Sequence, residues 1–87
     1  MLTASWERSA VRSIHTTAHK RLVARLREAR LKAGLTQVQV AKRLRKPQSF
    51  VSSLESGQRR IDVVELLDFA RLYGVTLAWL LEGLDRP

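Results

Sequence analysis

The chain has 87 residues, with 16 basic and 8 acidic side chains and no cysteine. A chain this short buries one core at most, and the lack of cysteine excludes disulfides and thiolate metal sites. No apolar run approaches the ~18–20 residues that cross a bilayer, and no secretory signal is evident at the N-terminus, so a cytoplasmic protein is expected.

Charge is unevenly distributed along the sequence. Residues 1–60 carry 14 basic and 3 acidic side chains, a net charge of +11, whereas residues 61–87 carry 2 basic and 5 acidic ones, a net charge of −3. Such a basic excess favours a polyanionic partner, with nucleic acid the commonest and a membrane surface the main competitor. We therefore expect one basic surface, with the acidic end of the chain facing away from it.

The first predicted helix runs from about Thr16 to Ala33. It follows an N-terminal extension, residues 1–14, to which no structure is assigned, and it opens a single domain over residues 15–87. The helix is predicted from apolar residues at i, i+3, i+4 and i+7 spacing, and Gly34 ends it. These apolar residues are Leu22, Val23, Leu26, Ala29 and Ala33. His15 and His19 have no acidic or cysteine partner nearby, so we expect solvent-exposed histidines and no metal site.

Two short helices follow, joined by a link of about three residues. Thr36 is a good N-cap for a helix reaching Leu44, and Pro47 suits the first turn of a helix that ends before Gly57. The second of these helices turns Val51 and Leu54 inward. Its outward face is polar and consists of Gln48, Ser49, Ser52 and Ser53.

Two further helices complete an all-α fold of five helices. Asp62 can cap a helix to Tyr73, and Thr76 can cap a short helix over residues 77–83. The apolar face of the longer one is formed by Val63, Leu66, Leu67, Phe69, Ala70 and Tyr73. Five short helices can share one core.

The two short helices form a helix-turn-helix, in which the second helix enters the DNA major groove. The segments "GLTQVQVAKRL" and "PQSFVSSLESGQRRIDVVELLDFARLYGVTLAWLL" resemble the lambda-repressor-like DNA-binding domain of the Cro/CI or XRE family, from about residue 15 to residue 81. The resemblance implies that Gln37 binds a phosphate and braces the recognition helix, and that Arg30 and Glu55 form a salt bridge. It also implies that Gln48, Ser49 and Ser53 reach base edges.

Cations flank the polar face of the recognition helix on both sides. Arg45, Lys46, Arg59 and Arg60 are expected to bind the phosphates of the duplex, while Gln48 and the serines, Ser52 included, contact bases. Arg45 stands where the family usually has glycine. Either the turn takes another shape, or Arg45 tolerates a left-handed conformation that costs about 1 kcal/mol. For Phe50, packing back on the preceding helix is favoured over contact with a thymine methyl.

These features predict a DNA-binding transcriptional regulator that acts on double-stranded DNA as a homodimer at a palindromic operator, as a repressor or controller protein. Dimerisation is expected through Leu77, Leu80 and Leu84, which offer more apolar surface than a short terminal helix needs. The alternative is an antitoxin that binds a toxin protein and represses its own operon. A module that only docks proteins is disfavoured by the basic excess. No catalytic group can be assembled from these residues, so an enzyme is not expected, and neither is a cofactor or a metal ion. A membrane partner is not expected either.

Overall fold

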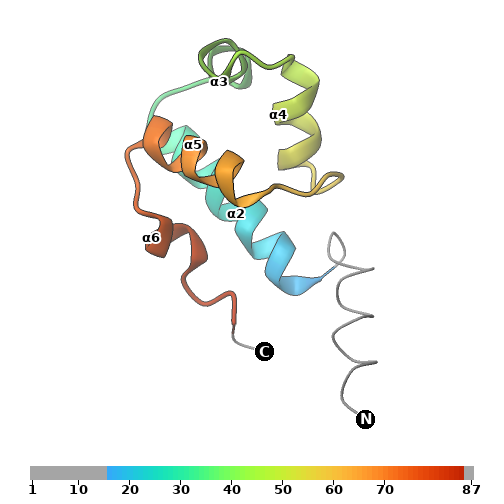
Figure 1. Cartoon of the computed structure of the whole chain (residues 1–87), viewed down its shortest axis with the longest axis vertical. Coiled ribbons are helices and arrows are strands. Elements are labelled where there is room, and N and C mark those ends of the chain that lie inside the picture. Colours follow the sequence, from blue (N-terminus) through green and yellow to red (C-terminus); the bar gives the residue numbers. More distant parts are fainter. Residues whose placement is uncertain (1–15, 86–87) are drawn as a thin grey trace.

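The computed structural model describes residues 16–85, all of whose regular structure is helical (Figure 1). The helices, in chain order, are α2 Thr17–Lys32, α3 Gln37–Leu44, α4 Gln48–Glu55, α5 Val63–Tyr73 and α6 Leu77–Leu81. The prediction of an all-α fold with five helices in this part of the chain is confirmed. The extension over residues 1–14 lies outside the described residues.

Polar side chains start the helices where the sequence predicts. Thr16, Thr36, Asp62 and Thr76 are the N-caps of α2, α3, α5 and α6, and each side chain accepts a hydrogen bond from a backbone amide in the first turn. Helices α3 and α5 also carry a complete capping box, in which the third helical residue returns a side-chain hydrogen bond to the cap. These bonds satisfy backbone amides that have no partner within the helix.

The core is formed by residues from all five helices. Helix α2 contacts α4, α5 and α6, while α3 packs mainly on α4. Figure 1 shows α3 and α4 at one end of the molecule and α6 toward the other. The largest fully buried side chains are Phe69, Leu26, Leu54, Leu80, Val40 and Val51. Ala41 of α3 is also buried in this core.

Three positions differ from expectation. Val63, predicted to face the core, is 67% exposed, because it lies one turn before Leu66, the first buried residue of α5. Ala33 is exposed because α2 ends at Lys32 and Ala33 is its C-cap. His19, predicted to be exposed, is buried on the same side of α2 as Val23 and Leu26, and its Nε2 has no hydrogen-bond partner.

Candidate nucleic-acid interface

The turn between α3 and α4 is built around Arg45. Arg45 has φ 57° and ψ 44°, the left-handed conformation, and it is the only residue other than glycine with a positive φ in the described chain. The amide of Lys46 donates to the carbonyl of Ala41 (2.9 Å), and that of Arg45 donates to Lys42 (3.2 Å). This is the Schellman pattern, which satisfies the last carbonyls of a helix. Of the two alternatives for Arg45, the structure therefore shows the left-handed one, with the side chain exposed.

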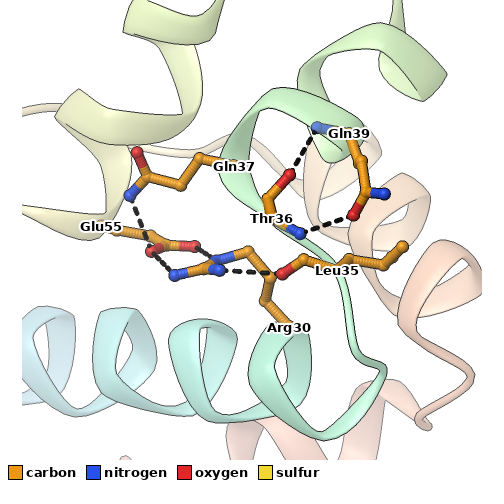
Figure 2. Close-up of polar contacts among 6 residues, drawn as sticks. All are labelled: Arg30, Leu35, Thr36, Gln37, Gln39 and Glu55. Atoms are coloured by element: carbon orange, nitrogen blue, oxygen red, sulfur yellow. Dashed lines mark hydrogen bonds and ion pairs between the residues drawn. The ribbon is translucent and has the colours of Figure 1, made fainter.

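A buried ion pair joins α4 to α2. Arg30 on α2 donates to both carboxylate oxygens of Glu55 on α4, at 2.7 Å from Nε to Oε2 and 3.0 Å from Nη2 to Oε1 (Figure 2). The two side chains are only 9% and 5% exposed. The hydrogen bond to Glu55 raises the pKa of Arg30, so the guanidinium stays charged. Arg30 Nη1 also donates to the carbonyl of Leu35 (2.9 Å), which ties the segment entering α3 to the same pair.

Gln37 joins this network at the start of α3. Its Nε2 donates to Glu55 Oε1 at 3.1 Å. Figure 2 shows its amide oxygen turned away from Glu55, so the side chain spans the gap between α3 and α4. One hydrogen of Nε2 remains for another acceptor. Gln37 therefore links the two helices of the motif, and it sits among the first amides of α3, where the helix dipole favours an anion.

The outward face of α4 carries the four residues expected to contact bases. Gln48 and Ser49 are exposed in the first turn, and Ser52 and Ser53 are half-buried. The hydroxyls of Ser52 and Ser53 both point at the carbonyl of Ser49 within the same helix. In the described part of the chain, no contact engages the side chain of Gln48. The first turn of α4 is thus free to approach another molecule.

Phe50, on the other side of α4, packs into the protein. It is 7% exposed and stacks on Phe69 of α5, with ring centroids 6.1 Å apart and planes within 5°. Phe50 is therefore packed inside the protein as expected, but its ring partner lies on α5 and not on the preceding helix α3. The Arg59 guanidinium lies 4.2 Å from the centroid of the Phe50 ring, and Lys46 Nζ lies 5.2 Å from it. One buried ring thus contacts cations from both ends of α4.

The four cations expected to bind phosphate differ in their exposure and in their contacts. Arg45, Lys46 and Arg60 are exposed. Arg59 lies on the Phe50 ring, donates to the carbonyl of Arg60 (3.2 Å) and approaches Glu65 to 3.8 Å. Its guanidinium is therefore engaged in holding the segment between α4 and α5.

The described cations of α2 do not all belong to one free basic surface. On α2, Arg21 donates to the carbonyl of Gly83 (3.1 Å), and Arg25 lies 3.7 Å from Glu82 and 4.5 Å from the Trp79 ring. Lys32 pairs with Glu28 (2.9 Å) and lies 5.6 Å from the same ring. The expectation of a single basic face is wrong to this extent, because several α2 cations hold α6.

Two exposed cations near the turn were missed by the sequence reasoning. Lys42 and Arg43 lie in the last turn of α3, separated from Arg45 by Leu44 alone. They belong to the run "AKRLRKP", whose basic density was the available signal. Their positive charges also interact favourably with the negative, C-terminal end of the α3 dipole.

Comparison with known proteins identifies the family to which this chain belongs. A family model described as helix-turn-helix matches residues 26–80. A solved structure, titled an XRE-family like protein from Pseudomonas syringae pv. tomato str. DC3000, is 43% identical, with a TM-score of 0.75, over 91% of this chain and 99% of that one. The chain belongs to the XRE-type helix-turn-helix family. Among curated proteins, none matches it.

Membership of the XRE-type family makes the protein a DNA-binding transcriptional regulator. The family's helix-turn-helix corresponds here to α3 and α4, with α4 as the recognition helix. Among residues 16–85, no cluster of three or more histidine, aspartate or glutamate side chains is placed to hold a metal ion. None of the described helices has the length and apolar content needed to cross a membrane.

The residues expected at a dimer interface are not equivalent in this XRE-type structure. Leu80 is fully buried in the core of its own chain, so its assignment to an interface is wrong. The helical spacing that suggested it turns Leu80 toward the core instead. Leu77 and Leu84 are half-buried, and Leu81, which was not among the expected residues, is 40% exposed.

Proposed function

We propose that this XRE-type regulator recognises a palindromic operator as a homodimer and represses transcription from it. The observation that carries the proposal is the first turn of α4, where only Pro47 separates exposed Gln48 and Ser49 from exposed Arg45 and Lys46. Base-contacting groups and cations are adjacent there. The Arg30–Glu55 pair keeps the helix that bears them fixed to the core.

In the proposed mechanism, α4 enters the major groove with its first turn leading. Gln48 can make a bidentate contact with the N6 and N7 atoms of adenine, which is the stronger discriminating contact on this face. The remaining Nε2 hydrogen of Gln37 and the first amides of α3 are available to a phosphate. Short serine side chains allow α4 to approach the bases closely.

Most of the affinity is attributed to the exposed cations. Three of them in each protomer, Arg45, Lys46 and Arg60, would neutralise about six phosphates in a dimer. Binding should then weaken on the order of a thousandfold between 50 and 200 mM salt. A bandshift titration across this range tests the proposal, and an affinity that hardly changes with salt contradicts it.

The DNA sequence specificity of the protein is tested by selecting bound sequences from random duplex DNA. Gln48→Ala should lose about 1–3 kcal/mol and relax one base position in each half-site. Gln58→Ala is the matched control, because Gln58 is an exposed glutamine just beyond the end of α4. The control should keep the base preference of the wild type. Unchanged preference in Gln48→Ala removes Gln48 from the set of base-contacting residues.

The homodimer is proposed to form through the apolar end of α6, with exposed Leu81 in place of Leu80 and with Leu77 and Leu84 on either side of it. Exposed apolar patches commonly mark interfaces. Light scattering of Leu81→Glu should give a monomer, whereas Val64→Glu, a change at an apolar residue that is 69% exposed on α5, should remain dimeric. A monomeric wild type, or a dimeric Leu81→Glu, refutes this interface.

A further inference from the structure

The inference concerns what the serines of α4 can recognise, and it depends on the proposed role of α4 in the major groove. A serine hydroxyl has one proton to donate and two lone pairs that accept. Which of these faces outward decides which base atoms the residue can contact.

The proton of Ser53 is already committed within the protein. Its Oγ is hydrogen-bonded to the carbonyl of Ser49, one turn earlier in α4, which can only accept. Ser52 Oγ reaches the same carbonyl at 3.4 Å, and Ser56 Oγ donates to the carbonyl of Ser53 at 3.1 Å. Back-bonding of this kind is a recognised way for serine to satisfy its donor inside a helix.

In the α-helix the Ser49 carbonyl also accepts a hydrogen bond from the backbone amide of Ser53. The amide and the hydroxyl of Ser53 together therefore occupy both lone pairs of this carbonyl oxygen. The longer contact from Ser52 is therefore the weaker of the two, and Ser52 can turn away at little loss. Ser49 itself is exposed, and none of the described residues engages its hydroxyl. Ser53 is thus the serine of this face whose hydrogen-bonding direction is set before any ligand arrives.

We propose that Ser53 contacts a base only as an acceptor, and so selects the exocyclic amino group of adenine or cytosine. In the major groove the donors are adenine N6 and cytosine N4, whereas guanine N7 and O6, adenine N7 and thymine O4 are acceptors. Donation to any of those acceptors would first break the bond to Ser49. A lone pair facing an acceptor without a proton between them is repulsive, which adds discrimination against the wrong edge.

The test uses the duplex selected by the wild-type protein, with single base analogues placed along each strand. One scan deletes exocyclic amines, replacing adenine by purine and cytosine by 2-pyrimidinone. A second scan deletes the N7 acceptor with 7-deazapurines. Each duplex is titrated with the wild type, Ser53→Ala and Ser49→Ala, after melting curves confirm that all three are folded.

Apart from the adenine assigned to Gln48, one amine deletion in each half-site should weaken the wild type about threefold to tenfold, as expected for a single neutral hydrogen bond. The same deletion should leave Ser53→Ala unaffected, while Ser49→Ala should keep the full effect. The inference is overturned if the duplexes that distinguish wild type from Ser53→Ala are the 7-deazapurine ones, if no analogue distinguishes them, or if Ser49→Ala also abolishes the effect. Failure to select any duplex removes the proposed function as well, whereas selection without an amine contact at Ser53 removes only this inference.

Discussion

Replacing Arg45 by glycine should stabilise the fold and weaken DNA binding at the same time. Arg45 is the C-cap of α3 at φ 57°, and Gly74 is the C-cap of α5 in a similar left-handed conformation, at φ 69°. A β-carbon in this conformation costs about 1–2 kcal/mol. Glycine also loses more freedom on folding, which offsets about 0.5–1 kcal/mol. The net gain is about 0.5–1 kcal/mol, a rise in melting temperature of about 2–8 °C for a domain of this size.

The same substitution removes one exposed cation per protomer beside the recognition helix. The slope of log affinity against log salt should fall by about 2 for a dimer. Arg45→Ala is the matched control, since it removes the charge but keeps the β-carbon. Thermal melting and salt-dependent bandshifts of the two variants separate the effects. Equal melting temperatures for Arg45→Gly and Arg45→Ala would refute the strain, and an unchanged salt slope in both would refute the phosphate contact.

Other predictions concern groups whose partners are visible. Arg30→Met or Glu55→Leu alone should destabilise by about 3–5 kcal/mol in urea unfolding, and the double variant should recover most of the loss, because only the single changes leave a buried charge unpaired; a double variant as unstable as the singles would contradict this. Burial raises the pKa of Tyr73, the only tyrosine. The stability that this provides is complete below the ordinary value of about 10 and declines as pH rises above it, so tyrosinate absorbance should appear together with loss of helical circular dichroism. Tyrosinate forming at its ordinary pKa in the folded protein would be the opposite result. Arg60→Ala should lower the salt slope without changing stability, whereas Arg59→Ala should lower stability by about 0.5–1 kcal/mol; equal melting temperatures would show that Arg59 does not hold its segment.

The helices were predictable because residues next to each helix end determine where the helix begins and stops. Thr36 and Asp62 each precede a helix by one residue and satisfy its first amides, and neither role depends on the rest of the chain. Gly74 likewise ends α5 in a conformation that glycine adopts without a β-carbon penalty. The Arg30–Glu55 pair required more, since nothing in the spacing of residues 25 apart indicates contact. The family resemblance supplied that expectation.

Burial was less predictable, since it depends on where neighbouring helices end. Leu80 and Leu81 are adjacent leucines, yet the first is fully buried and the second is 40% exposed. Val63 continues the apolar stripe of α5, but it lies beyond the reach of the core. Periodicity identifies a face of a helix, whereas only the packed structure shows how far along that face the contact extends.

Charge shows the same limit and has a functional consequence. A net charge summed along the sequence treats every cation as available to DNA, but Arg25 and Lys32 contact the Trp79 ring and hold α6. Cations near the α3–α4 turn, such as Arg43 and Arg45, are exposed instead, and their side chains contact no ring in the described part of the chain. Removing the first kind should therefore change stability before it changes the salt dependence of binding, and removing the second kind should do the reverse. The positive charge of this small domain accordingly serves both its fold and its proposed ligand, through separate residues.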